Sequence, residues 1–545
     1  MTGVIEQLLA SRGLTELALR QAFFSPDYEQ SKHDPFLLPD MSKAVDRLLK
    51  AKQKGELVYI YGDYDIDGLT ATTLLLEAFE AFGIKAKAFI PNRFTDGYGL
   101  SKAAMRLLAE RKAKLVVTVD CGSLSHGEIE LANQLGMDVI VTDHHTVADT
   151  MPSAVATINP KRTDHKYPFI DLAGVGVAFK LVQALQQKTD GLPLGQEKWL
   201  LDLVALGTVC DVVQLLDENR TNVFWGLRVM SKTRRHGIKA LAHVAGLELD
   251  KVNARSLGFV LGPHLNAAGR IETAQLSLDL LVATDPLKAV EVAYKLRELN
   301  LARRSDQQSI AKQAMEQAEQ FAADKVLVLS HPDWSHGIIG IVAAKVQESL
   351  YKPTFVLQEL GEQSKGSARS FGDFSAVDAI RSADPLIIKG GGHKFAAGVT
   401  LKTTNIPAFR KALNDFYLKQ NLQGQSSYFE PKADVTVGDL GELTDEVVQV
   451  VRQLEPYGHG NPEPVFYLPR AIISRRQLLG KDSTHLKLDA TDSNGKLWQF
   501  IGFGMAEKYK FNVGDEVCMW FKLIENEWRG VRRLEGQIVK ISDYV

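Results

Sequence analysis

The sequence contains little cysteine, no long apolar run and almost no net charge. Its 545 residues include three cysteines, Cys121, Cys210 and Cys518, which lie far apart and form no CxxC pair. This excludes a small disulfide scaffold and argues against a zinc ribbon. No run of about 18 apolar residues occurs, and the first residues lack the pattern of a secretion signal. We therefore expect a cytoplasmic protein that does not associate with a membrane.

The charge balance gives no sign of a nucleic-acid partner. The chain has 64 Lys and Arg against 66 Asp and Glu, a formal net charge of -2. Any site for a polyanion must therefore be local. There is also no GxxxxGK[ST] loop, so we expect no built-in ATP motor. The length, with 45% apolar residues, is enough for about three domains.

Short apolar runs alternate with amphipathic helical stretches between about residues 57 and 178. The runs, each ending in polar residues, are LVYIYGDYD, KAKAFIPN, LVVTVDCGS, DVIVTDHH and AVATINP. Continuous apolar runs are typical of strands buried on both faces, so this pattern predicts a parallel α/β sheet. In such sheets functional residues gather at the carboxyl ends of the strands.

The rest of the chain divides into a long helix, a second α/β unit and a small barrel. Asp285 and Pro286 begin a predicted helix whose second half is too polar for a packed core, which indicates a connector. After a linker over 421–427, short strands at hairpin spacing predict an antiparallel barrel. There, basic residues such as Arg475 interleave with aromatic ones such as Trp498, as a single-strand groove requires. The predicted domains are 1–284, the connector 285–323, 324–420 and 428–545.

Asp63, Asp65 and Asp67 follow the first predicted strand directly. Three carboxylates this close repel one another unless a cation lies between them. The alternative is a solvated turn that only caps the following helix. We favour the cation site because similar residues recur elsewhere along the chain.

Asp120 ends the strand LVVTV, Asp143-His144-His145 ends DVIVT, and Asp211 follows the apolar run LVALGTVC, which we also interpret as a strand. Carboxylates with imidazole and without thiolate suit Mn²⁺ or Mg²⁺ better than structural zinc. So many carboxylates favour two ions that share a bridging Asp, an arrangement that serves phosphoryl displacement.

These motifs resemble the four motifs of the DHH phosphoesterase superfamily, which is named for the triplet at 143–145. The string GGGH at 390–393, followed by AAG, is similar to the signature of the accompanying DHHA1 domain. Four further segments look like the bacterial RecJ single-stranded-DNA exonucleases: GPHLNAAGR, WSHGIIGIVA, SARS and EPYGHGNPEPVF. The resemblance covers nearly the whole chain and implies that the barrel is an OB-fold for nucleic acid.

The resemblance also assigns site residues. It implies that the metal ligands are Asp63, Asp65, Asp67, Asp120, His144 and Asp211, where Asp63 is either a ligand or lies behind one. It implies that His145 faces the scissile phosphate and forms the catalytic set with Asp67 and Asp120. The substrate-binding residues that we expect from it are Asn266, Arg270, His336, Arg369, Ser370, Gly392 and His393. For His336, capping of the following helix is the alternative.

The implied function is a 5′-to-3′ exonuclease in DNA repair and recombination that releases 5′-mononucleotides from single-stranded DNA. Only the resemblance implies the polarity. It further implies a single-strand-binding protein and a helicase as partners, and we expect a monomer. One alternative is a DHH phosphodiesterase for pyrophosphate, cyclic dinucleotides or short oligonucleotides, for which the third domain is superfluous. The other is a non-catalytic DNA-binding scaffold, against which the retained carboxylates count.

Overall fold

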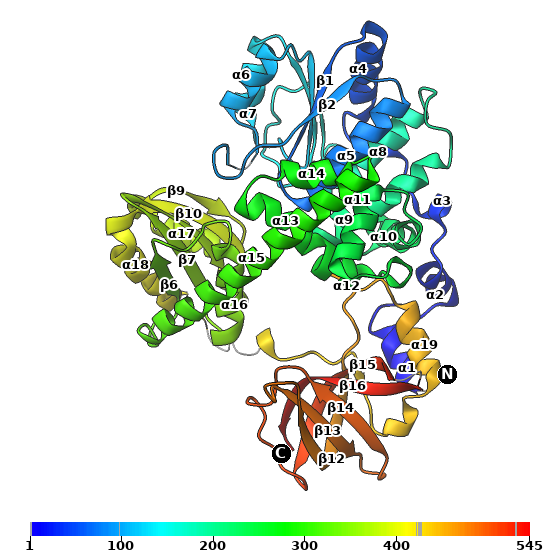
Figure 1. The fold of residues 1–545 in the computed structure, drawn as a ribbon, viewed down its shortest axis with the longest axis vertical. Coiled ribbons are helices and arrows are strands. Elements are labelled where there is room, and N and C mark those ends of the chain that lie inside the picture. Colours follow the sequence, from blue (N-terminus) through cyan, green and yellow to red (C-terminus); the bar gives the residue numbers. More distant parts are fainter. Residues whose placement is uncertain (1–2, 98, 421, 423–427, 529–530, 545) are drawn as a thin grey trace.

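In the computed structural model the five apolar runs of the first unit form one parallel sheet (Figure 1). The structure describes residues 3–97, 99–420, 422, 428–528 and 531–544, so the predicted linker lies outside it except for Leu422. The strand order is β2-β1-β3-β4-β5. The strands are β1 (Val58–Gly62), β2 (Ala86–Phe89), β3 (Leu115–Val119), β4 (Asp138–Thr142) and β5 (Ala156–Ile158). The predicted parallel α/β sheet is confirmed.

Helices cover both faces of this sheet. Val58 and Ile60 of β1 pack in one apolar cluster with α4 (Met41–Lys54), α5 (Ile66–Ala81) and α8 (Gly174–Gln186). Tyr59 and Tyr61 pack in another cluster with α6 (Lys102–Glu110) and α7 (His126–Gln134). Alternate side chains of each strand are therefore buried on opposite faces, which is why the strands are continuous apolar runs.

A helical region follows the sheet. Its helices are α9 (Leu201–Cys210), α10 (Asp217–Met230), α11 (His236–Ala245), α12 (Ala254–Ser256), the π-helix η4 (Leu257–Leu261), α13 (Gly262–Ile271) and α14 (Gln275–Leu281). The expectation that Asp211 follows a strand is wrong, because the run LVALGTVC belongs to α9 and Asp211 is its C-cap. Residues 201–208 are all buried, and a short run buried on every side looks the same in a helix and in a strand.

The connector is α15 (Pro286–Glu319), whose first turn is capped by the Asp285 side chain. It leads to a second sheet with the order β6-β7-β8-β10-β9. The strands are β6 (Leu327–His331), β7 (Thr354–Leu360), β8 (Gln363–Arg369), β9 (Ile387–Gly392) and β10 (Ala396–Lys402). Three helices accompany them: α16 (Ile339–Leu350), α17 (Ala376–Ser382) and α18 (Ile406–Lys419).

The C-terminal strands form a closed five-stranded barrel in the order β12-β13-β14-β16-β15, closed by pairing of β12 with β15. The strands are β12 (Phe466–Leu479), β13 (His485–Thr491), β14 (Leu497–Gly502), β15 (Glu516–Trp528) and β16 (Val531–Asp543). A short strand, β11 (Val435–Thr436), lies beside β12, and α19 (Asp445–Gln453) precedes the barrel. None of the described helices is both long and apolar enough to cross a membrane.

The start of the chain belongs to the barrel core. Val4, Ile5 and Leu8 of α1 (Gly3–Ala10) are buried in one apolar cluster with barrel residues such as Phe466. Figure 1 shows α1 beside the barrel, far from α4. Two further helices, α2 (Leu17–Phe24) and α3 (Tyr28–Ser31), run from there toward the first sheet.

A buried arginine joins the same regions. The guanidinium of Arg220, on α10, donates hydrogen bonds to four backbone carbonyls, those of Phe23, Leu454, Glu455 and Pro456. It also lies 3.6 Å from the ring centroid of Phe23. Arg220 therefore ties the helical region to both the last turn of α2 and the loop before the barrel.

Candidate active site

Three aspartates lie side by side at the carboxyl edge of the first sheet. The register pairs Gly62 with Val119 and Val119 with Thr142, so the residues that follow are neighbours. These residues are Asp63, Asp120 and Asp143, and all three are almost completely buried. Asp120 has a left-handed φ of 61°. That conformation costs about 1–2 kcal/mol for most residues with a side chain, although Asp adopts it more readily than most.

The other two carboxylates of the first motif contact helix ends. Asp65 caps α5, because its Oδ1 accepts hydrogen bonds from the backbone N–H groups of Asp67 and Gly68. The alternative interpretation of this motif, a turn that only caps the following helix, therefore holds for one oxygen of Asp65, its Oδ1. The buried carboxylate of Asp67 accepts from the N–H groups of Gly174 at 2.6 Å and Val175 at 2.8 Å, at the start of α8. The positive end of that helix favours an anion there.

His144 lies among the carboxylates. Its Nε2 is 3.1 Å from Oδ1 of Asp120, 3.5 Å from Oδ2 of Asp211 and 3.7 Å from Oδ2 of Asp67. The side chains form three groups of possible metal ligands. Within each group, the ligand atoms all lie within 4.8 Å of one another. The groups are Asp63 with Asp65 and Asp120, Asp67 with His144 and Asp211, and Asp120 with His144 and His145.

These donor groups fit divalent cations. Oδ1 of Asp63, Oδ1 of Asp120 and both ring nitrogens of His144 are buried without a hydrogen-bond partner in the part of the chain that the structure describes. Buried polar atoms are otherwise nearly always paired. Asp120 belongs to two of the groups, as the bridging carboxylate of a two-ion site would, whereas His144, with one lone pair on Nε2, can serve one ion through that nitrogen. The donors are oxygen and imidazole, which suits Mn²⁺ or Mg²⁺.

The electrostatics of the cluster lead to the same conclusion. Burial first, and then the neighbouring carboxylates, raise the pKa of Asp67 to about 7 and that of Asp211 to about 9. The same causes raise the pKa values of Asp63 and Asp120 well above their ordinary range. Burial, followed by the charge of His145, lowers the pKa of His144 to about 3. A bound cation would relieve the repulsion among these carboxylates and would find a neutral imidazole ligand beside them.

Asp143 holds the histidines in place. Its Oδ1 accepts hydrogen bonds from the backbone N–H groups of His144 and His145 and from Nδ1 of His145, at 2.7, 3.1 and 2.8 Å. Burial opposes ionisation of Asp143, but the hydrogen bond and charge of His145 outweigh it and lower the pKa of Asp143. Asp143 therefore stays a carboxylate that orients the ring of His145.

Sequence reasoning missed two residues that support this loop. The buried amide of Asn159 donates to Oγ of Ser123 at 2.8 Å and to the carbonyl of His145 at 2.9 Å. Ser123 in turn donates its backbone N–H to Oδ2 of Asp143 at 2.9 Å. Asn159 directly follows β5, so the strand-end rule that identified Asp120 also applies to it.

Gly174 was also missed. A Cβ atom there would lie 2.8 Å from Oδ1 of Asp120 and 2.9 Å from Oδ2 of Asp67. No side chain fits between these two carboxylates and the start of α8. The repeated glycines of AGVGVAF, in the first turn of α8, are the sequence signal for this.

Arginines gather beside the cluster. Burial first, and then the charges of Arg93, Arg303 and Arg369, lower the pKa of Arg270 to about 10. Arg270 donates to the carbonyl of Gly337 in the second unit at 3.1 Å, and Arg93 lies 4.3 Å from the ring centroid of Tyr64. Within the described residues, no ion pair joins these arginines to a carboxylate. An anion between the two units would relieve their mutual repulsion.

The remaining predicted substrate residues have different surroundings. Asn266 lines the same cavity as Arg270. The hydroxyl of Ser370 is buried and donates to the carbonyl of Phe374 at 2.6 Å. Gly392 and His393 lie on the exposed hairpin that joins β9 to β10.

His336 faces the first unit. Its ring meets that of Phe94 edge-on, with centroids 5.3 Å apart, and its pKa is lowered by burial and then by Lys365 and Arg93. The capping alternative for His336 is wrong, because α16 begins at Ile339 with Ile338 as its N-cap.

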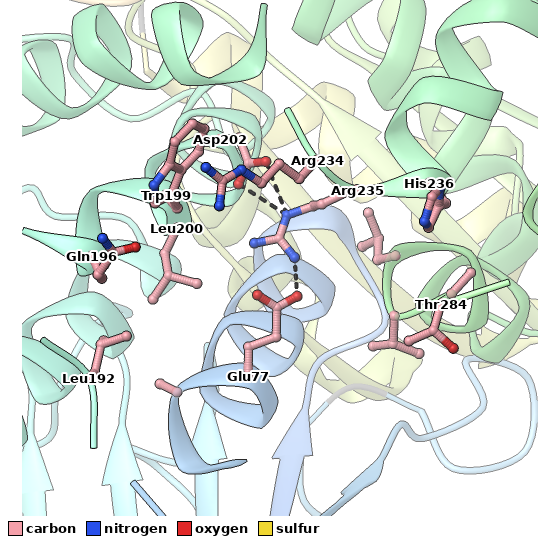
Figure 2. A pocket seen from close by; sticks show the side chains of 14 residues that line it. Glu77, Leu192, Gln196, Trp199, Leu200, Asp202, Arg234, Arg235, His236 and Thr284 are labelled. Carbon is pink, nitrogen blue, oxygen red and sulfur yellow. Dashed lines mark hydrogen bonds and ion pairs between the residues drawn. The ribbon is translucent and has the colours of Figure 1, made fainter. Parts of the chain in front are cut away.

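A separate cavity of about 470 Å³ lies beside the C-terminal half of α5 (Figure 2). Arg235 crosses it and pairs with Glu77 and with Asp202, the latter at 3.0 Å. None of the predicted site residues lines it. The charge of Arg235 is already balanced by these two carboxylates, so we do not assign chemistry to this cavity.

Three family models match the chain. The DHH family N-terminal domain matches residues 57–208, the DHHA1 domain matches 323–419, and the RecJ OB domain matches 435–540. These matches support the expected order of domains, while the bounds given above stay predictions.

Curated relatives match over most of the chain. The single-stranded-DNA-specific exonuclease RecJ of Bacillus subtilis is 34% identical, over 98% of this chain and 67% of the relative. The protein with the same description from Escherichia coli is 36% identical, over 91% of this chain and 89% of the relative.

A solved structure of RecJ from Thermus thermophilus in complex with Mn²⁺ superposes with a TM-score of 0.84 and 29% identity. It covers 99% of this chain and 76% of that one. The Mg²⁺ complex of the same protein gives a TM-score of 0.77 and 28% identity, over 98% and 74% of the two chains.

Proposed function

The chain belongs to the RecJ family of single-stranded-DNA-specific exonucleases, and from this premise we propose that it degrades single-stranded DNA from the 5′ end to 5′-mononucleotides. The observation that carries the proposal is the position of the arginines around Arg270, which form no ion pair within the described residues, beside the buried carboxylates. The arginines attract the phosphates of a nucleic-acid strand. The carboxylates are suitable ligands for metal ions that promote hydrolysis of the phosphodiester.

The enzyme is metal-dependent, and Mn²⁺ or Mg²⁺ fits its donor atoms. We propose that Asp65, Asp67, Asp120, His144 and Asp211 hold two ions, with Asp63 as a ligand or directly behind one. Two such ions supply charge stabilisation for the phosphodiester and lower the pKa of water. Asp67 is fixed for this role by the amides of Gly174 and Val175, and His144 by the backbone bonds to Asp143.

His145 is the candidate to contact the scissile phosphate. Asp143 accepts from its Nδ1, which fixes the ring and directs Nε2 away from Asp143. Burial opposes protonation, but the hydrogen bond and charge of Asp143 outweigh it and raise the pKa of His145. A ring held this way donates a hydrogen bond to a phosphate oxygen and strengthens it as negative charge develops.

Several further features belong to the same proposal. Arg270, Arg369 and His336 would hold the backbone of the strand between the two units. Since the sequence contains no ATP motor, a helicase would supply single strands and a single-strand-binding protein would present them. We propose that the protein acts as a cytoplasmic monomer in DNA repair and recombination.

The test uses single-stranded oligonucleotides labelled at the 5′ or the 3′ end, with Mn²⁺ or with EDTA. We expect metal-dependent release of a labelled mononucleotide from the 5′ label at once, and a ladder of shortening products from the 3′ label. Duplex DNA, pyrophosphate and a cyclic dinucleotide are offered in parallel. Asp211→Asn should abolish turnover, while Asp306→Asn, an exposed position on α15, should not.

The other outcomes are also informative. Release of the 3′ label first would contradict the polarity. Faster hydrolysis of the cyclic dinucleotide would favour the small-substrate phosphodiesterase. Binding of the oligonucleotide without cleavage in Mn²⁺ would favour the non-catalytic DNA-binding scaffold.

A further inference from the structure

Phe259 is an exposed aromatic ring on a rigid element. Its exposed fraction is 78%, whereas Leu257 and Leu261 in the same π-helix are buried. These two leucines anchor the turn on the core and leave Phe259 facing outward. Single π-helical turns are rare and occur often at functional sites, because the extra residue changes which side chain the helix presents.

Phe259 lines a cavity of about 680 Å³ beside the active site. The lining includes Ile66, which lies between Asp65 and Asp67 in the chain, and Cys210, which precedes Asp211. It also includes Tyr457 and Lys522, from the loop before the barrel and from β15. The cavity therefore lies between chain neighbours of the carboxylate cluster and the C-terminal part of the chain.

The charge of this cavity fits a phosphate backbone. Three arginines, Arg255, Arg270 and Arg303, line it together with Lys522, and these cations outnumber the two lining carboxylates, Glu455 and Glu463. Arg303 donates only to the neutral side chains of Asn300 and Gln307, and Arg255 lies 5.8 Å from the ring centroid of Phe259. None of the three forms an ion pair with a carboxylate among the residues described. An aromatic ring among such cations is the combination that binds single-stranded nucleic acid.

We propose that Phe259 stacks on one unpaired base of the substrate strand as it runs from the active site toward the barrel. This rests on the proposed function for the identity of the strand. A base within a duplex has both faces covered by its neighbours, so only a single strand offers a free face to the ring. Phe259 therefore contributes to the preference for single strands as well as to affinity.

The experiment measures binding of a fluorescent oligonucleotide in EDTA, where no turnover occurs, and kcat and KM in Mn²⁺. Phe259→Ala should weaken binding by about 5- to 150-fold, the range for stacking of one base. It should raise KM and leave kcat nearly unchanged, and Phe259→Trp should restore binding. Tyr294→Ala, a half-exposed aromatic residue on α15, is the matched control and should bind as the wild type does.

A scan with a single abasic nucleotide identifies the stacked base. The wild type should lose affinity at one position of the oligonucleotide, and Phe259→Ala should not respond there. Equal binding by wild type and Phe259→Ala, or the same abasic profile in both, would overturn the inference. If the wild type binds but does not cleave, the proposed function fails, while the scan still decides the role of Phe259.

Discussion

Replacing Asp67 with Asn should stabilise the metal-free protein while it destroys activity. The carboxylate is buried beside Asp65, and its pKa is raised from 3.8 to about 7. A shift of about 3 units corresponds to about 4 kcal/mol that the folded metal-free protein loses when this group ionises. Asn keeps one oxygen for the amides of Gly174 and Val175, and the weaker contact costs about 1–3 kcal/mol. The net gain is about 1–3 kcal/mol at about pH 8.

The pH dependence follows from the sign of this shift. Because the folded pKa lies above the unfolded value, the folded state holds one more proton between about pH 4 and pH 7, so wild-type stability falls as pH rises through this window. Asp67→Asn has no carboxyl group at this position, so its stability does not fall in this way. The gain in its free energy of unfolding over the wild type should therefore be absent at about pH 4 and complete above about pH 7.

Urea unfolding in EDTA across this pH range measures the difference, and Asp306→Asn should match the wild type throughout. Activity in Mn²⁺ should fall by at least about 100-fold, the upper effect of residues that only support a metal ligand. If Asp67→Asn is less stable than the wild type at every pH, the energetic account of the cluster is wrong. Retained activity would remove Asp67 from the metal site.

Three further predictions address the metals, α8 and the junction with the barrel. Adding Mn²⁺ to EDTA-treated protein should stabilise it by about 2.7 kcal/mol when free metal is about 100 times its Kd, and calorimetry should show no such gain for Asp211→Asn. Gly174→Ala should weaken Mn²⁺ binding in titration calorimetry by at least about tenfold, whereas Gly176→Ala, whose Cβ would meet nothing closer than 3.4 Å, should not. Arg220→Met should lower the free energy of unfolding by at least about 2 kcal/mol and expose the loop before the barrel to protease, because four carbonyls lose their donor; unchanged stability would refute that assignment.

The sequence predicts the parts of the site that depend on strand ends. Asp63, Asp120 and Asp143 each follow a continuous apolar run, and parallel pairing brings such positions together whatever the loops do. Asp211 was found by its motif, but its local structure was not, because eight buried residues in a row fit a helix as well as a strand.

Contacts between distant segments leave no local pattern and could not be predicted. Nothing near Arg220 indicates that its partners are carbonyls 197 to 236 residues away. Likewise the amphipathic pattern of α1 shows that one face is buried, but not that the barrel covers it. The exposure of Phe259 could not be predicted from the sequence either, because a single aromatic residue in an apolar segment usually belongs to the core.

The position of α1 in the barrel core has a consequence for biosynthesis. Val4, Ile5 and Leu8 leave the ribosome about 460 to 540 residues before the barrel strands that cover them. At about 5–20 residues per second, their apolar face waits for roughly 20 to 110 seconds without its partner. The nascent chain therefore needs protection at its beginning until its end is made, and a transcript that stops before β12 yields a first domain that carries an uncovered helix.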